Sequence, residues 1–442
     1  WADVLQRTGK RTQADLNFRG GGENHNFFIS GGYLNDQGIA IESGFKRYNV
    51  RANIDAKARP WLNVGLNVAG SSTLQKYPQS EDSNTENIIN FTRLVPSFYP
   101  YYERNADGSH RLDENGNKIY DFGLYRPSAA IPNNNLASSL PLDLNDIRRE
   151  NMSARAYLEA VFTPNLKLRS TYSVDYINSN RHDYTNPLVG YGVETGGYVG
   201  KTNVRTVGQT WNNILTFDKQ INDHHINILG GQEYYDFNSG DFNGSRQQFV
   251  LPGFYEPIAA SQLNDFTGSS VDYRLLSFLG RAEYNYANKY YLSGSLRTDG
   301  SSRFAKETRW GTFWSIGASW RLINENFLKD QDLLNQLTLR ASFGGQGNDN
   351  LGTYYANQGL YTIANSLGEG GTYTERLATP ELKWETNLNL NVGVDIAAFE
   401  NRVALSVEYF NRQSKDLLFT MPMAISTGYS GYDANIGSLR NT

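Results

Sequence analysis

Residues 46–57 read Lys-Arg-Tyr-Asn-Val-Arg-Ala-Asn-Ile-Asp-Ala-Lys, and apolar and polar side chains alternate along most of this stretch. The apolar set is Tyr48, Val50, Ala52, Ile54 and Ala56, and the polar set is Asn49, Arg51, Asn53, Asp55 and Lys57. Successive side chains of a β-strand point to opposite faces, so the stretch predicts a strand with one apolar and one charged face. At least ten further segments repeat the pattern. Such repetition is typical of a sheet with hydrocarbon on one side and water on the other, as in a large membrane barrel.

Together the alternating segments predict an all-β chain, an antiparallel transmembrane β-barrel of 14–15 strands. They lie at about 11–19, 25–34, 46–57, 61–74, 151–162, 166–178, 208–219, 224–237, 271–286, 289–299, 310–321, 337–345, 384–397 and 402–411, with a fifteenth near 434–440. In the segment 384–397, Leu388 and Val392 alternate with Asn389 and Asp395. Polar side chains on the second face argue against a packed core there, and a soluble sandwich rarely continues such a face through so many long strands.

The connections between the predicted strands alternate in length. The short ones are 20–24, 58–60, 163–165, 220–223, 287–288 and 398–401. The long ones are about 75–150, 179–207, 238–270 and 346–383, and 35–45 and 300–309 are intermediate. One connection of the short set, 322–336, is longer, and its apolar residues suggest a brief helix. Tight turns at one rim and long loops at the other characterise outer-membrane barrels, so we expect short periplasmic turns and long extracellular loops.

Composition excludes several classes of protein. The 442 residues include 41 basic and 45 acidic side chains, which gives no support to nucleic-acid binding. Cysteine is absent, which excludes disulfides and Cys-ligated metals. The sequence contains no apolar run of about eighteen residues, so no spanning helix is expected, whereas a barrel strand needs only about 9–11 alternating residues. The chain begins at Trp1 without an initiator Met or a signal region, so we expect a piece of a longer, processed polypeptide.

The longest predicted loop, 75–150, carries signals of ordered structure. Ser83-Asn84-Thr85-Glu86 matches a capping box before an apolar pattern that ends at Pro96, which predicts a short helix. Hairpin-type turns are predicted at 105–108 and 113–117. An ordered aromatic loop on one rim is a suitable place to bind a ligand. The candidate contacts are Tyr99, Tyr101, Tyr102 and Arg104, and the alternative is that they pack within the loop.

No catalytic, cofactor or metal site is expected. Residues 196–202 resemble a phosphate loop but have one residue too few between the outer glycines, and no strand-then-helix context surrounds them. Residues 113–117 begin like a calcium loop, but the bidentate Glu at the twelfth position is missing. The five histidines are scattered along the chain. Nothing in the sequence supports an enzyme.

Several segments, in order along the chain, resemble one family. They are Ser30-Gly31-Gly32-Tyr33-Leu34-Asn35-Asp36-Gln37-Gly38, Phe45 to Arg51, Leu296-Arg297-Thr298-Asp299-Gly300-Ser301-Ser302-Arg303-Phe304, Trp314 to Arg321, Leu339 to Asn348, Trp384-Glu385-Thr386-Asn387, Asp416-Leu417-Leu418 and Asn435-Ile436-Gly437-Ser438. The Arg-x-Asp-Gly-Ser-Ser-Arg-Phe segment is the most specific. The chain resembles the barrel region of SusC/RagA-type TonB-dependent outer-membrane transporters of Bacteroidetes.

The resemblance implies a 22-stranded barrel that is closed by an N-terminal plug and covered by a SusD-like surface lipoprotein as a lid. It implies import of oligosaccharides or oligopeptides, powered through the TonB–ExbB–ExbD complex. The plug, the TonB-contacting segment and the last strands are expected outside this chain, so 1–442 is expected to be a partial barrel domain. Arg51, Asp55, Asn389 and Asp395 are expected to line the lumen or contact the plug, and the alternative is that they only solvate its wall.

Two rival functions stay open at this point. A TonB-dependent siderophore receptor would share the barrel, and so would a structural or adhesive surface protein that uses a barrel as an anchor. A neighbouring gene for a SusD-like lipoprotein would favour nutrient import, and iron-repressed expression would favour siderophores. The sequence does not distinguish glycan from peptide cargo, because aromatic loops suit both.

Overall fold

A computed structural model of the chain describes residues 1–78, 86–124 and 126–442. Fifteen strands form one antiparallel sheet in which each strand pairs with the next. They are β1 (Lys10–Gly22), β2 (His25–Gln37), β3 (Gly44–Arg59), β4 (Leu62–Lys76), β5 (Leu144–Thr163), β6 (Leu166–Thr185), β7 (Tyr198–Ile221), β8 (His224–Phe249), β9 (Ala260–Tyr286), β10 (Tyr290–Ser301), β11 (Trp310–Arg321), β12 (Leu334–Asn348), β15 (Glu385–Ala398), β16 (Val403–Lys415) and β19 (Ser438–Asn441). The predicted all-β antiparallel barrel fold is confirmed.

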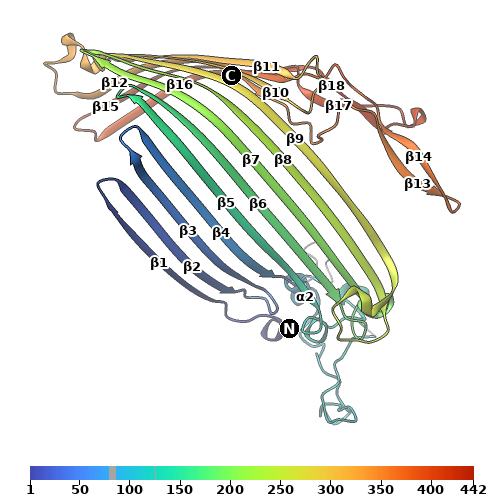
Figure 1. Cartoon of the computed structure of the whole chain (residues 1–442). Coiled ribbons are helices and arrows are strands. Elements are labelled where there is room, and N and C mark those ends of the chain that lie inside the picture. Colours follow the sequence, from blue (N-terminus) through green and yellow to red (C-terminus); the bar gives the residue numbers. More distant parts are fainter. Residues whose placement is uncertain (79–85, 125) are drawn as a thin grey trace.

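Figure 1 shows a curved wall of long strands with tight turns gathered at one end. The long connections gather at the other end, and we call these the short-turn end and the long-loop end. Two hairpins stand outside the wall, β13 (Leu360–Ser366) with β14 (Glu369–Arg376) and β17 (Leu418–Pro422) with β18 (Gly431–Asn435). The sequence analysis did not predict either hairpin, and it merged β18 and β19 into one segment.

The middle strands are longer than predicted. β7 begins at Tyr198, β8 continues to Phe249 and β9 begins at Ala260, so the predicted loops 179–207 and 238–270 are largely strand. In these extensions Asn238 pairs with Asp272 and Gly240 with Ser270, and neither face is apolar. Apolar alternation therefore ends before the strand does, because above the hydrocarbon layer both faces of the sheet are wet.

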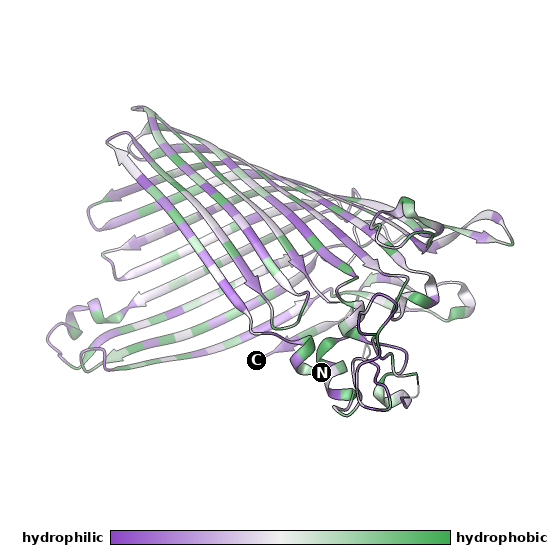
Figure 2. Cartoon of the chain, turned by 90° about the horizontal axis from the view of Figure 1, so that it is seen from below, coloured by the Kyte–Doolittle hydropathy of each residue, from purple (hydrophilic) through white to green (hydrophobic). Residues whose placement is uncertain are grey.

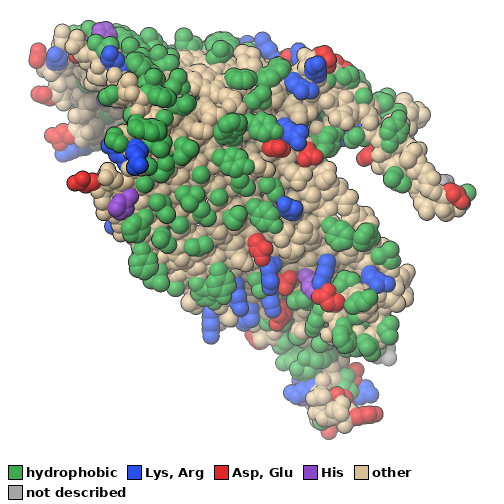
Figure 3. Space-filling view, viewed as in Figure 1, with side chains coloured by type: hydrophobic (Ala, Val, Ile, Leu, Met, Phe, Trp, Pro, Cys, Tyr) green, Lys and Arg blue, Asp and Glu red, His purple; other side chains and the backbone are tan. Residues whose placement is uncertain are grey.

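The two faces of the wall differ as the sequence predicts. On one face lie large apolar side chains that are exposed, such as Leu292, Ile316 and Val407, with 52%, 58% and 54% of their surface accessible. Figure 2 shows hydrophilic and hydrophobic residues alternating along the strands, and Figure 3 shows hydrophobic side chains spread across one face. So much exposed apolar surface requires a non-aqueous partner, which the bilayer supplies.

Aromatic side chains mark the short-turn end. The Tyr286, Tyr290 and Trp320 rings stack in sequence, with centroids 6.3 and 6.0 Å apart. Glu325 caps this row, because it accepts hydrogen bonds from the Tyr290 hydroxyl at 2.7 Å, from Lys289 Nζ at 2.9 Å and from Trp320 Nε1 at 3.0 Å. These bonds lower the pKa of Glu325 to about 2. Rings that join a polar partner to an apolar body are typical of a bilayer interface.

The helices are short and lie in the connections. They are α1 (Ala2–Leu5), α2 (Ile88–Leu94), α3 (Leu136–Ser139) and α4 (Gly192–Thr195), with 3-10 turns η1 (Ser128–Ala130), η2 (Pro257–Ala259), η3 (Leu322–Asn324), η4 (Asn326–Leu328) and η5 (Ile425–Thr427). The brief helix expected within 322–336 is therefore the pair η3 and η4. Among the described residues, no helix is both long and apolar enough to cross a membrane.

The connection 77–143 has its own hydrophobic core. Phe91 of α2, Ile131 and Leu136 are almost fully buried together, and Leu5 of α1 packs with them. The predicted helix is confirmed as α2, but its N-cap is Asn87, whose side chain accepts the backbone N–H groups of the second and third helical residues. The capping residues proposed from the sequence, 83–85, lie outside the described residues.

A buried carboxylate joins two long connections. Asp143 Oδ1 accepts the backbone N–H of Asn186 at 2.8 Å and its side-chain N–H at 2.7 Å. Burial raises the pKa of Asp143 to about 6, and repulsion from Glu86 adds to the shift, while the bonds from Asn186 oppose it. At neutral pH this junction therefore holds a negative charge in a poorly solvated place.

Orientation of the two faces can be tested on β15. Val392 is 46% exposed on the apolar face and its neighbour Asn391 lies on the polar face. We expect Val392→Arg to lower the free energy of unfolding in lipid vesicles by about 2–4 kcal/mol, since arginine would then face the hydrocarbon. Asn391→Arg is the matched control and should change it little. Equal losses in a urea titration would contradict the assignment.

The Asp143 junction predicts a pH dependence. Its folded-state pKa of about 6 lies above the ordinary value near 3.9, so stability falls as pH rises between these values and stays low above them. Asp143→Asn keeps an acceptor for Asn186 without the charge. Hydrogen exchange of 186–190 should be slower in this variant at pH near 7.5, by about 2 kcal/mol of protection, and unchanged near pH 4. A difference that is the same at both pH values would refute burial of the charge as the cause.

Candidate functional site

The sequence segments that carry the family resemblance meet at the long-loop end of β10. Arg297 lies on the polar face, where it donates to Asp299 at 2.7 Å, to Glu233 at 3.0 Å and to Ser277 at 2.9 Å. Arg297 and Asp299 share a face because they are two residues apart on one strand. The network joins three neighbouring strands, β8, β9 and β10.

Arg303 connects β10 to the chain that follows β12. Its guanidinium stacks between the rings of Tyr273 and Tyr354, at 5.0 and 4.7 Å from their centroids. Asp349 Oδ2 accepts hydrogen bonds from the Tyr273 hydroxyl at 2.8 Å and from Ser301 Oγ at 2.7 Å. Arg303 Nη1 donates to the Asp349 carbonyl at 3.0 Å. The residues after Gln346-Gly347-Asn348 are thereby fixed against the Ser-Ser-Arg-Phe segment.

Trp384 completes this arrangement. Its Nε1 donates to the Arg309 carbonyl at 2.7 Å, and its ring packs against Phe304, which is fully buried, and Phe313. Asn435 then holds the last segments, because its side-chain N–H groups donate to the carbonyls of Lys383 and Asp416, both at 2.9 Å. These family-specific residues bind one another and hold the connections of β10, β12, β15 and β16 together.

The structure places the four expected lumen residues on the polar face of the wall. Asp55 accepts a hydrogen bond from the Tyr157 hydroxyl at 2.7 Å. Asp395 accepts from Arg340 Nε at 3.1 Å and from Ser406 Oγ at 2.6 Å, and Asn389 donates to a backbone carbonyl of its own strand. These three are held by neighbours of the wall. Arg51 differs, because it lines an open hollow of about 670 Å³.

Tyr99, Tyr101, Tyr102 and Arg104 line one hollow of about 440 Å³ with Trp1 and His110. Much of their surface is used within the loop. The Arg126 guanidinium lies 5.6 Å from the ring centroids of both Trp1 and Tyr99, and Tyr102 packs on Tyr120 at 4.8 Å. Tyr101 and Arg104 keep the most accessible side chains, and the Tyr101 residue is 38% exposed. The loop thus gathers all four residues and uses two of them for its own packing.

A second hollow beside this one was not predicted. It measures about 630 Å³ and lies between residues 103–124 and 188–194, with Arg104, Arg111, Phe122, Leu188 and Tyr191 among its lining. Arg104 borders both hollows. The local sequence offers no signal for this groove, because its two sides come from connections that are separated by β5 and β6.

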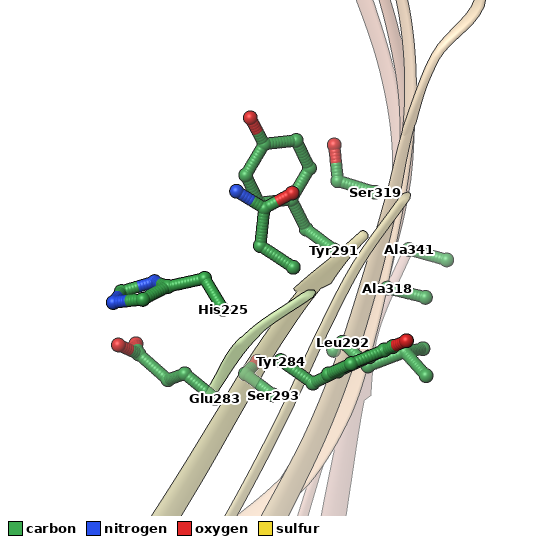
Figure 4. A pocket seen from close by; sticks show the side chains of 11 residues that line it. His225, Glu283, Tyr284, Tyr291, Leu292, Ser293, Ala318, Ser319 and Ala341 are labelled. Atoms are coloured by element: carbon green, nitrogen blue, oxygen red, sulfur yellow. The ribbon is translucent and has the colours of Figure 1, made fainter. Parts of the chain in front are cut away.

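The short-turn end holds a polar hollow on the inner side of the wall. Figure 4 shows His225 and Glu283 next to each other, with Tyr291 and Ser319 on the same side, whereas Leu292, Ala318 and Ala341 point to the opposite side. His225 Nε2 lies 3.3 Å from Asp218. Within 1–78, 86–124 and 126–442, His, Asp and Glu side chains form no group of three or more that could bind a metal ion.

Comparison with known proteins agrees with this geometry. Residues 90–442 match the family described as TonB dependent receptor-like, beta-barrel. TonB-dependent receptor P3 of Formosa agariphila is 29% identical over 451 residues, which cover 100% of this chain and 43% of the relative. TonB-dependent receptor SusC of Bacteroides thetaiotaomicron is 25% identical over 457 residues, covering 100% of this chain and 45% of SusC.

Solved structures share the fold. The RagAB peptide importer in its closed-closed state superposes with a TM-score of 0.83 at 24% identity, covering 100% of this chain and 48% of that one. The siderophore receptor PirA of Acinetobacter baumannii gives 0.55 at 12% identity, covering 99% of this chain and 57% of that one. The chain thus spans about half the length of the relatives that it matches. With its matched family, its two-faced wall and its SusC-like relatives, the chain belongs to the TonB-dependent receptor β-barrel family of the outer membrane.

Proposed function

We propose that the protein containing this barrel actively imports a nutrient, an oligosaccharide or oligopeptide, across the outer membrane. The observation that carries the proposal is the continuous polar face on a wall whose other face is apolar, because such a wall encloses a water-filled path through the bilayer. Likeness to SusC over the whole chain supports nutrient import. The energy would come from the TonB–ExbB–ExbD complex, and a SusD-like surface lipoprotein would cover the long-loop end.

In this proposal the long-loop end faces the cell exterior. Connection 77–143 would then be the long extracellular loop, and Tyr101 and Arg104 its exposed contacts to cargo or lid. Tyr99 and Tyr102 would position those two through the packing described above. Cargo would pass from the loops to the polar face once the plug moves, and Asp55, Asn389 and Asp395 would line that path.

Energy dependence is the direct test of the proposed function. Cells that express the full-length protein should accumulate labelled oligosaccharides or oligopeptides, and a protonophore or deletion of TonB should abolish the uptake. Deletion of the adjacent surface lipoprotein gene, where present, should weaken capture. Uptake of ferric siderophore alone would favour the siderophore receptor, and adhesion with no uptake would favour an anchor.

The loop contacts predict a second result. Tyr101→Ala combined with Arg104→Gln should lower cargo binding to intact cells several-fold, since an aromatic surface and a charged donor are lost. The control is Arg93→Gln on the exposed side of α2, which removes the same charge away from the hollow. Equal binding by both variants at equal surface amounts would show that the hollow does not contact cargo.

A further inference from the structure

The polar face of β3, β4 and β5 has an unusual composition near the long-loop end. Register places four residues of each strand in rows, Arg47, Asn49, Arg51 and Asn53 beside Thr73, Ser71, Ala69 and Asn67, and these beside Arg149, Asn151, Ser153 and Arg155. Four of these twelve are arginine, four are asparagine, and the largest apolar side chain is that of Ala69. We call Arg47, Arg51, Arg149 and Arg155 the arginine patch.

No member of the arginine patch forms an ion pair within the part of the chain that the structure describes. Arg155 Nε donates to Ser173 Oγ at 3.3 Å, and Arg47 Nε is buried without any hydrogen-bond partner. Other charged groups of this face are paired, as Arg340 is with Asp395 and Glu408. The arginine patch therefore keeps hydrogen-bonding capacity that the wall does not use.

The patch borders an open hollow of about 670 Å³. Arg47, Arg51, Asn49, Ser71 and Asn151 contribute to its surface, and Asn151 donates to Ser71 across its floor at 3.3 Å. Asp15 of β1 and Asp175 of β6 stand at its two sides, and neither is paired with a patch arginine. The first carboxylates on β3 and β5 themselves are Asp55 and Glu159, farther toward the short-turn end and already bonded to Tyr157 and Arg169.

The spacing suits a chain that carries several anionic groups. Arg47 and Arg149 share a row with one strand between them, which puts their backbones about 10 Å apart. Arg47 and Arg51 are four residues apart on one strand, or about 13 Å. Guanidinium groups bind carboxylate and sulfate oxygens in a bidentate manner, while amides and hydroxyls between them bond neutral hydroxyl groups.

We propose that the arginine patch is a binding site for an acidic oligosaccharide, one that carries carboxylate or sulfate groups on its rings. This rests on the proposed import function and names the class of cargo. Sugar is favoured over peptide because the floor offers amides and hydroxyls to ring hydroxyls, and nothing larger than Ala69 to an apolar peptide side chain. The patch lies near the long-loop end, where it would receive cargo before the rest of the polar face.

The test uses the full-length protein purified in detergent and three labelled probes: tetragalacturonate, neutral maltotetraose and a tetraglutamate peptide. Tetragalacturonate should bind best, and more weakly as salt rises from about 50 to about 500 mM. Arg51→Gln with Arg155→Gln should weaken it about tenfold or more, since charge-assisted bonds become neutral ones. The control, Arg19→Gln, removes the same charge from the polar face of β1 near the short-turn end, and should bind as the wild type does.

Four results would overturn the proposal. They are undiminished tetragalacturonate binding by the double variant, equal binding of maltotetraose, tighter binding of tetraglutamate, or a double variant that opens a steady ion conductance in planar bilayers. The last would mean that the patch holds a plug inside the barrel. Import can fail separately: energy-dependent uptake of another sugar without tetragalacturonate binding refutes only the patch, whereas no uptake of any cargo refutes the proposed function.

Discussion

Hydrocarbon cannot hydrogen-bond to a peptide group, and this constraint governs the whole chain. Every N–H and C=O within the bilayer must find a partner in the protein, which a β-structure achieves only by pairing each strand on both sides. β3 shows the result, because it pairs along nearly its whole length with β2 on one side and β4 on the other. Since backbone bonds lie in the plane of the sheet, the side chains are free to satisfy lipid on one face and water on the other.

That freedom explains why the polar face can hold so much charge. Arg340 with Asp395 and Glu408, and Arg297 with Asp299 and Glu233, bridge neighbouring strands at places where a soluble sheet would have its core. Ion pairs of this kind cost little where water reaches them, and they add modestly to stability. Beyond the apolar band the strands continue with two wet faces and carry the connections away from the membrane.

Local pattern predicted the strands well because alternation is a property of each strand alone. It could not predict the ends of β7, β8 and β9, where Asn238 and Gly240 pair without any apolar face to mark them. Register between strands was also beyond reach. Arg51 was expected to face the lumen, but its neighbourhood with Arg149 and Arg155 depends on how β4 meets β5 across the connection 77–143. The loop residues Tyr99 and Tyr102 were identified together, yet only the structure shows how far they serve packing.

Residues that identify the family and residues free to bind cargo are different sets in this chain. Arg303, Asp349 and Trp384 are fixed by stacking, buried hydrogen bonds and each other, so replacing one disturbs the connections of several strands. Arg47 and Arg51 stabilise nothing comparable, because the ladder of β3 is formed by its backbone. A wall position that only meets water can change its charge at little cost to the fold. The same barrel can therefore keep its architecture at 25–29% identity to its relatives while the groups along its inner face differ.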